Sequence, residues 1–211
     1  MKYNYDPPVV IKNIFRNWKW NTSNKKVLFT FDDGPITENT IKILDELETS
    51  KVKTIFFCVG NNIIKNPELV NEILDRGHEI GNHTMNHKLI TNLSAQEFSF
   101  ELDTFNQLMK ERFNYSVKYF RPPHGRFDLI TSKKLKERNL INVMWSLLTR
   151  DYKNDFNLVK FAVDNYLKKN SIIVLHDSLK SKNIILDSIK YTLERVNKNG
   201  FEIGEPAECL K

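Results

Sequence analysis

The sequence predicts an α/β fold built on parallel strands, because strand-like and helix-like segments alternate about seven times along the chain. Polar motifs follow several of the expected strands, and the carboxyl ends of parallel strands form the active site in (β/α) barrels. An open doubly wound sheet is the alternative, but no glycine-rich phosphate loop follows the first strand. We therefore expect a barrel-like domain with its functional residues at one rim.

The expected elements follow from apolar runs, helix caps and stop signals. Thr37 is placed to cap a first helix, Asn66-Pro67 starts another that stops at Gly77, and Ser94 to Glu97 forms a capping box. Strands are expected at residues 27–29, 52–59, 79–81, 117–120, 141–145, 171–175 and 201–203. Further helices are expected at residues 131–138, 158–167 and 184–196.

Composition indicates one soluble domain. Of the 211 residues, 40% are hydrophobic and 27% charged, which is ordinary for a globular protein. No apolar run approaches the roughly 18 residues of a spanning helix, and the first residues lack a secretory-signal pattern. We therefore expect a cytoplasmic monomer, with envelope association or a homo-oligomer as the alternatives.

The net charge of +6 is spread along the chain without a basic stripe that interleaves aromatics, so no nucleic-acid partner is predicted. A surplus of positive charge favours an anionic polymer or surface, although a solvated basic face is the simpler interpretation. Cys58 and Cys209 are far apart and fit no metal-site spacing, and Cys58 lies in an apolar run where it is expected to be a small buried residue.

The N-terminal segment, residues 1–24, contains apolar residues at helical spacing between Val9 and Trp20. If this segment is a helix, its basic residues lie on a different face from its apolar residues. A basic helix with aromatic residues can lie on a membrane surface. The preferred interpretation is a short amphipathic helix that packs on the domain and covers its open end or edge. The domain itself is expected to span residues 25–211.

The motif Thr30 to Pro35 places two carboxylates and a Gly-Pro turn at the end of the first strand. Neighbouring residues on an extended backbone point to opposite sides. Asp32 and Asp33 are therefore expected to face different partners, such as a metal ion and a proton. An ordinary polar turn is the alternative for this motif taken alone.

His83 and His87 stand four residues apart, and on a helical turn both rings would reach one ion. Two histidines and one carboxylate, with an open fourth position, make a catalytic zinc site. Asp33 or Asp32 would supply the carboxylate. The motif lacks the glutamate of the metalloprotease helix.

His176 ends an apolar strand, so it is expected at the same rim, where a general acid is a better interpretation than a core histidine. Arg121 lies in Arg-Pro-Pro-His-Gly, where two prolines stiffen the backbone. A surface ion pair there would contribute little, whereas a fixed guanidinium fork could hold a catalytic carboxylate.

Together, these motifs resemble the five ordered motifs of the NodB-type polysaccharide deacetylases, carbohydrate esterase family 4. The matching stretches are Thr30–Pro35, His83–His87, Arg121–Gly125, Trp145–Tyr152 and Leu175–Asp177. The resemblance implies a single-domain distorted (β/α)7 barrel that hydrolyses N-acetyl, or sometimes O-acetyl, groups on sugars.

The resemblance also implies a role for each residue. The ligands of Zn²⁺, or of another divalent transition metal such as Co²⁺, would be Asp33, His83 and His87. Asp32 would be the base, oriented by Arg121, and His176 would be the acid. A backbone N–H after the proline pair would hold the oxyanion, and Pro123, His124 and Tyr152 would line the substrate groove.

Two departures from the family pattern lie in the third and fourth motifs. His124 stands where the family has an aromatic residue, and Leu148 and Tyr152 replace the first Asp and the Trp of Asp-x-x-Asp-Trp. Asp151 and Asp177 are the candidates to support Arg121 and His176. Asp151 is preferred, because Asp177 follows His176 directly and should point away from it.

The function expected from this resemblance is the metal-dependent removal of N-acetyl groups from an amino sugar in a poly- or oligosaccharide. Peptidoglycan and chitin oligomers are the obvious substrate types. A deformylase of a lipid-linked amino sugar, a cyclic-amide hydrolase and a non-catalytic carbohydrate-binding relic are the alternatives. A relic would need neither Asp32 nor His176.

Overall fold

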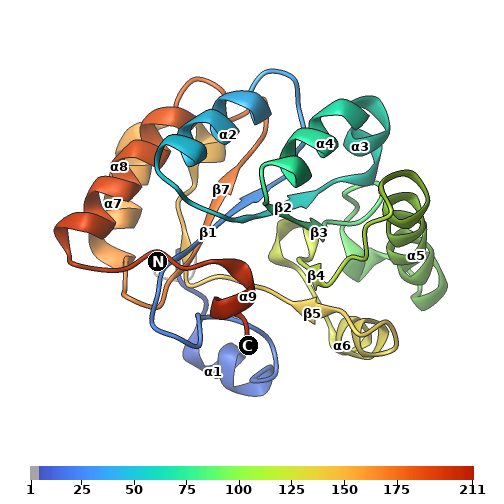
Figure 1. Ribbon diagram of the computed structural model, residues 1–211. Coiled ribbons are helices and arrows are strands. Elements are labelled where there is room, and N and C mark those ends of the chain that lie inside the picture. Colours follow the sequence, from blue (N-terminus) through green and yellow to red (C-terminus); the bar gives the residue numbers. More distant parts are fainter. Residues whose placement is uncertain (1–4) are drawn as a thin grey trace.

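A single sheet of seven parallel strands in the order β5-β4-β3-β2-β1-β7-β6 organises the molecule. The computed structural model describes residues 5–211. The strands are β1 (Leu28–Asp32), β2 (Ile55–Cys58), β3 (Glu79–Asn82), β4 (Tyr119–Phe120), β5 (Ile141–Asn142), β6 (Leu147–Leu148) and β7 (Ile172–His176). The sheet curls (Figure 1), and the strand order makes β5 and β6 its two edges. This architecture confirms the predicted single-domain, distorted (β/α)7 barrel, in an open form.

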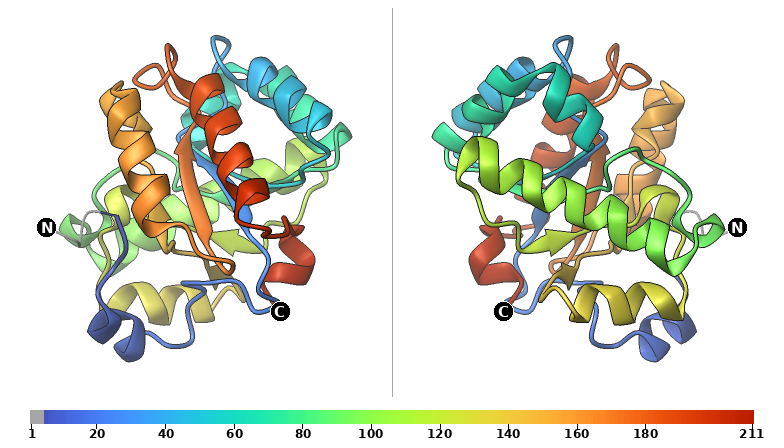
Figure 2. Two further views of the ribbon diagram at one scale, coloured as in Figure 1. Left: turned by 90° about the vertical axis from the view of Figure 1, so that its left-hand side faces the viewer. Right: turned by 90° about the vertical axis from the view of Figure 1, so that its right-hand side faces the viewer.

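Helices surround the outside of the curled sheet (Figure 1). They are α1 (Val9–Ile14), α2 (Thr40–Thr49), α3 (Gly60–Lys65), α4 (Pro67–Asp75), α5 (Ala95–Phe113), α6 (Leu129–Lys136), α7 (Phe156–Tyr166), α8 (Ile185–Lys198) and α9 (Pro206–Cys209). Short 3-10 turns cover Ile90–Asn92, Pro123–Gly125 and Asp151–Lys153. Two side views show α7 and α8 on one flank and α5 with α6 on the other (Figure 2).

The side chains of β1 point alternately to the two faces of the sheet, so one face packs in the core under the helices and the other leads to the candidate active site. Phe29 and Phe31 are fully buried in the main core, against the surrounding helices. Leu28 belongs to a second, smaller core. Since side chains alternate along a strand, Thr30 and Asp32 share the face of Leu28. The inner face of the curled sheet therefore turns from apolar to polar toward its carboxyl end.

Several sequence-based expectations are confirmed. The Ser94 hydroxyl accepts a hydrogen bond from the backbone N–H of Glu97, the Glu97 carboxylate accepts one from the N–H of Ser94, and this capping box opens α5. Pro67 is the first residue of α4, and Gly77 ends the segment with a positive φ of 75°. Cys58 is buried in β2 as a free thiol, and Cys209 is also buried and free.

Other boundaries were predicted wrongly. Thr37 does not cap α2, which begins at Thr40 after Asn39. Residues 52–54 precede β2 rather than belonging to it, and residues 201–203 contribute only an isolated bridge between Ile203 and Val27. The two-residue strand β6 and the helices α3 and α9 were not predicted, because such short elements show no hydrophobic period.

The N-terminal segment contacts both edges of the sheet, and its helix is shorter than expected. Leu148 of β6 donates its N–H to the carbonyl of Tyr5, and Lys19 forms a bridge with Val143 beside β5. This extended pairing at Lys19 requires the helix to end earlier, and α1 stops at Ile14. Residues 1–4 of the predicted segment lie outside the described part of the chain.

The aromatic part of this segment is what docks on the domain. Trp18 and Trp20 are buried with Met144, and Phe15 packs against them. By contrast, Val9, Val10 and Ile14 of α1 are exposed, so the helix itself contributes little to the core. Among residues 5–211, no helix combines the length and apolar character needed to cross a bilayer.

Candidate active site

Asp33, His83 and His87 lie together at the carboxyl end of the sheet. Oδ1 of Asp33 is 3.6 Å from Nε2 of His83 and 3.1 Å from Nε2 of His87. One potential ligand atom from each residue falls within 4.8 Å of the others. Nδ1 of His83 donates to the backbone carbonyl of Arg121 at 2.7 Å, and this hydrogen bond fixes the ring with its Nε2 turned toward Asp33.

The donor set and its electrostatics fit a divalent transition metal. Two imidazole nitrogens and one carboxylate leave a fourth position open, as in catalytic zinc sites. Burial raises the pKa of Asp33, but hydrogen bonds from His83 and His87 outweigh burial and hold this pKa well below its usual range. Asp33 is therefore ionised, as a ligand must be.

The two histidines reach Asp33 from a loop, so the predicted helical turn was wrong. Residues 83–87 follow β3 without helical hydrogen bonding. The loop is instead held by Asn82, which accepts from the N–H of Thr84, and by the Thr84 hydroxyl, which accepts from the N–H of His87. Positive φ angles of 66° at Thr84 and 54° at His87 bend the backbone so that both rings face one point.

Asp32 and Asp33 line the same cavity, which corrects the expectation that they point to opposite sides. The reason is the backbone at Asp33, which leaves the extended region with a φ of 78°. The expectation of different partners holds nonetheless. Asp33 faces the two histidines, whereas Asp32 faces Arg121.

Arg121 is fully buried and holds Asp32 in place. Its Nη1 donates to Oδ1 of Asp32 at 2.7 Å and to the Thr30 hydroxyl at 2.8 Å. Its other nitrogens donate to the carbonyls of Val143 and Met144, at 2.8 and 2.9 Å. A guanidinium with this many fixed acceptors cannot rotate away, so the position of the Asp32 carboxylate is fixed as well.

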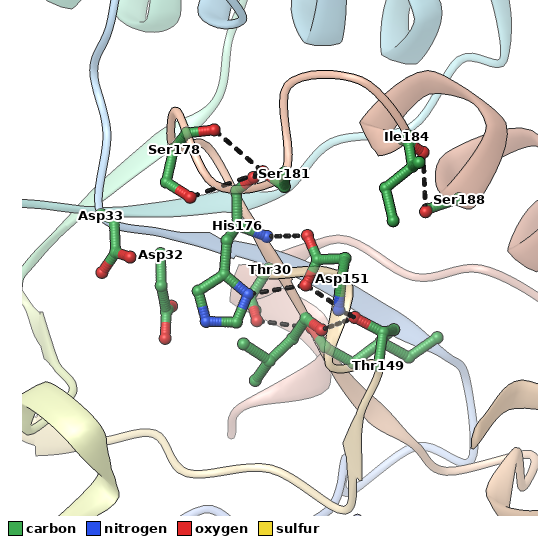
Figure 3. Close-up of polar contacts among 12 residues, drawn as sticks. Thr30, Asp32, Asp33, Thr149, Asp151, His176, Ser178, Ser181, Ile184 and Ser188 are labelled. Atoms are coloured by element: carbon green, nitrogen blue, oxygen red, sulfur yellow. Dashed lines mark hydrogen bonds and ion pairs between the residues drawn. The ribbon is translucent and has the colours of Figure 1, made fainter. Parts of the chain in front are cut away.

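His176 is held by Asp151 on the opposite side from Asp32 and Asp33 (Figure 3). Nδ1 of His176 is 2.7 Å from Oδ1 of Asp151, and the backbone N–H of His176 donates to Oδ2 at 2.7 Å. Asp151 is fully buried and also accepts from the Thr149 hydroxyl. Asp151 therefore supports His176 directly rather than through Arg121.

The strand register places His176 beside Asp32. The two residues are direct partners of neighbouring parallel strands, so their side chains lie on the same face of the sheet. Burial lowers the pKa of His176, but the Asp151 carboxylate and its hydrogen bond outweigh burial and raise this pKa to about 9. The imidazole is therefore protonated at neutral pH.

The predicted groove residues border the same cavity, with one exception. His124 and Tyr152 line it, whereas Pro123 is buried as the first residue of the 3-10 turn Pro123–Gly125. The His124 ring is 4.6 Å from the His87 ring, but His124 is not part of the three-residue ligand cluster. Within residues 5–211 no backbone carbonyl accepts from the N–H of His124.

Comparison with known proteins identifies the family. The Polysaccharide deacetylase family model matches residues 19–143, more than half of the chain. The chain belongs to the polysaccharide deacetylase family.

Two of this family's members show how far the similarity extends. A peptidoglycan-N-acetylglucosamine deacetylase of Bacillus cereus is 32% identical over 198 residues, which is 92% of each chain. The solved structure of the Bc1960 peptidoglycan N-acetylglucosamine deacetylase has a TM-score of 0.87 at 26% identity, covering 94% of this chain and 95% of that one.

A third comparison concerns the fold alone. The wild-type BA3943 of Bacillus anthracis is described as a CE4 family pseudoenzyme. It matches with a TM-score of 0.82 at 23% identity, over 91% of this chain and 68% of that one. The deacetylase fold therefore does not by itself establish catalysis.

Sequence reasoning missed several residues of this deacetylase-type site. Thr30 contributes a hydroxyl to Arg121 from the motif that was singled out for its carboxylates. Its position two residues before Asp32 was the available signal, because the two share a strand face. Trp145 begins the fourth matching stretch but was not assigned to the site, and Lys180 lines the cavity from a loop, where no periodic pattern could have placed it.

Asp177 supports the turn that carries Asp33 by packing against Gly34, the next residue in the chain. It points away from His176, as predicted, and accepts a hydrogen bond from Thr40 at 2.5 Å. Its backbone N–H donates to the carbonyl of Asp32 at 2.8 Å. The carboxyl group packs directly on Gly34, where an added Cβ would lie 2.3 Å from Oδ2 of Asp177.

Gly34→Ala should therefore weaken both the fold and the metal site. The new methyl group must push Asp177 or the Asp33 backbone aside, at a cost of about 1–3 kcal/mol in unfolding free energy. Zinc affinity should fall because Asp33 moves. Gly200→Ala is the control, since an added Cβ there meets nothing within 4 Å. Its only cost is the backbone strain of an alanine at a φ of 66°. Equal zinc affinities in the two variants, measured by chelator competition, would contradict the packing role.

Proposed function

We propose that this chain is a metal-dependent hydrolase that removes N-acetyl groups from an amino sugar within a poly- or oligosaccharide such as peptidoglycan or a chitin oligomer. The observation that carries the proposal is a single cavity of about 260 Å³ lined by Asp32, by His176 and by the ligand cluster. A base, an acid and a metal site around one small space are the groups that amide hydrolysis needs.

Asp33, His83 and His87 would hold the metal ion. When bound there, a divalent cation supplies Lewis-acid polarisation of the acetyl carbonyl and lowers the pKa of a water molecule. Asp32 accepts the proton of the attacking water, and Arg121 keeps the carboxylate in position for that transfer.

The remaining steps use the other side of the cavity. In this proposal the backbone N–H of His124, which has no backbone acceptor within residues 5–211, donates to the oxygen that gains negative charge. His176, charged and held by Asp151, donates the proton from Nε2 to the departing nitrogen, which is otherwise a poor leaving group. The amine and acetate then leave.

The relic alternative is less consistent with the site. A protein that only binds sugars has no use for a buried arginine fixed on Asp32 or for a buried carboxylate that raises the pKa of His176. Both arrangements are intact here, although a pseudoenzyme shares the fold.

Acetate release tests the proposal directly. The zinc-loaded protein should release acetate from N-acetylglucosamine oligomers and from peptidoglycan glycan strands, and mass spectrometry should show free amines on the products. A chelator should stop the reaction. Tight glycan binding without acetate release from any of these substrates would favour the relic instead.

Asp151→Asn should shift the alkaline limb of the kcat–pH profile to lower pH. His176 must be protonated when the amine leaves, so activity is present below its pKa and is lost as the pH rises through that value. Asp151 raises this pKa, to which Asp33 and Asp32 also contribute. Without the Asp151 carboxylate, burial lowers the pKa of His176, and the alkaline limb moves below its wild-type position.

The measurement is kcat against pH for both proteins, with metal content determined in parallel. Asp155→Asn is a matched control, because Asp155 caps α7 through the N–H of Asn157 rather than contacting His176. Coincident profiles for Asp151→Asn and the wild type would contradict the assignment of His176 as the acid.

A further inference from the structure

Four basic side chains surround the approach to the catalytic cavity. Lys180 lines the cavity itself, and Arg126, Arg150 and Lys153 line a neighbouring groove of about 660 Å³. We call these four residues together the basic groove. These four residues are part of the excess of Lys and Arg over Asp and Glu that gives the chain its positive net charge.

Cavity and groove form one continuous depression, because they share part of their walls. Trp145, Leu148 and Tyr152 line both, as do His124 and Gly125. A chain of sugars with one residue in the cavity therefore extends past the cations of the groove. Trp20 and Phe127 add further aromatic surface along the groove, and aromatic walls of this kind suit the apolar faces of sugar rings.

The cations of the basic groove lack carboxylate partners. Within residues 5–211 none of the four forms an ion pair, whereas Arg76, Arg138 and Lys168 do so elsewhere on the surface. Among the described residues, Asp32 and Asp33 are the only carboxylates in the lining of the cavity or the groove. Asp32 is paired with Arg121, and Asp33 faces His83 and His87, so neither neutralises the four cations, which produce a positive potential along the groove.

We propose that the basic groove selects glycans that carry carboxylates over neutral amino-sugar polymers. This inference rests on the proposed deacetylase function and adds the chemical class of its substrate. The carboxylate can belong to a uronic acid or to the lactyl ether of muramic acid, since both place an anion beside an N-acetylated sugar. Lys180 contacts the substrate nearest the reacting sugar, and the other three cations contact sugars farther along the chain.

The selection should appear in KM and should depend on salt. A partly exposed ion pair changes affinity by up to about fivefold, and several such pairs add when they are far enough apart. Salt screens exposed charges over about 8–10 Å at 0.1–0.15 M ionic strength. A preference that comes from the basic groove therefore shrinks as salt is added, whereas one that comes from sugar shape does not.

The test compares three soluble substrates of equal length on the zinc-loaded full chain. They are a chitin oligosaccharide, a hyaluronan oligosaccharide with its alternating glucuronic acid, and a peptide-free peptidoglycan glycan strand. Acetate release gives kcat and KM at low and high salt, and tryptophan fluorescence gives binding constants on the same protein. The acidic glycans should bind several-fold more tightly than chitin at low salt, and the better of the two identifies the source of the carboxylate.

Lys180→Gln should remove part of this preference and raise KM for acidic glycans by up to about fivefold, and the double variant Arg126→Gln/Lys153→Gln should raise it further because two ion pairs are lost. KM for chitin should change less. Lys198→Gln, at the far end of α8, is the matched control and should change none of these values.

The outcomes separate this inference from the proposed function. The protein could release acetate yet bind neutral and acidic glycans equally well, unaffected by salt or by Lys180→Gln. That result would contradict the selection of acidic glycans by the basic groove and leave the proposed deacetylase function intact. Absence of acetate from all three glycans would overturn the deacetylase. The fluorescence constants would still decide whether the groove prefers carboxylates.

Discussion

Asp32→Asn should abolish most of the turnover while the protein keeps its metal ion. Asparagine preserves the size of the side chain and can still accept a hydrogen bond from Arg121, but it cannot take the proton of water. Loss of a general base typically costs about 10²–10⁴-fold in rate. The metal should remain, because its ligands are Asp33 and the two histidines rather than Asp32.

The same variant should also lose stability, because Arg121 is fully buried and its carboxylate partner is Asp32. Leaving a buried charge without its counter-ion costs about 3–5 kcal/mol. The neutral acceptors of Thr30, Val143 and Met144 remain and limit that cost. Unfolding in denaturant, zinc content and kcat should therefore all be measured at a temperature where the variant is folded.

Asp33→Asn is the matched comparison for Asp32→Asn, because the two carboxylates are adjacent and undergo the same substitution. We expect Asp33→Asn to lose metal affinity first and activity as a consequence. If Asp32→Asn were the variant that lost zinc, and Asp33→Asn kept it, the two aspartates would have exchanged roles.

His83→Ala should remove both the metal ion and the activity. His83 is almost fully buried, and its ring is fixed by the hydrogen bond from Nδ1 to the carbonyl of Arg121, so it is held in position as a ligand. Zinc affinity should fall by at least about 10²-fold, since removal even of an outer partner of a metal ligand costs about 10–100-fold.

His124→Phe is the control for that variant. Its ring packs edge-on against His87 but lies outside the ligand cluster, so a phenylalanine can keep the packing. Zinc content, measured by atomic absorption after dialysis, should match the wild type for His124→Phe and be lost for His83→Ala. Loss of zinc from His124→Phe would add His124 to the ligands.

Much of the architecture followed from sequence, because the physics involved is local. The capping box at Ser94 and the proline that starts α4 use only neighbouring residues, so their effects can be predicted without a fold. The polar motifs met at one rim because parallel strands bring their carboxyl ends together. That single topological fact placed Asp33, His83 and His176 around one cavity.

The parts that could not be predicted depend on backbone bends and on distant carbonyl groups. His83 and His87 face one point through two residues with positive φ, not through a helix. Arg121 is held by the carbonyls of Val143 and Met144, and every residue has such a carbonyl, so residue identity carries no signal. Lys180 reaches the cavity from a loop whose path only the folded structure gives.

The measurement that tests the central claim most directly is a zinc titration of metal-free wild-type protein, followed by acetate release from an N-acetylated glycan. Three ligands form one site, so activity should rise linearly and reach its plateau at a single equivalent of zinc per chain. For Asp33→Asn, activity should show neither the linear rise nor the plateau at one equivalent of zinc. Full acetate release from protein verified to be free of metal would contradict the account.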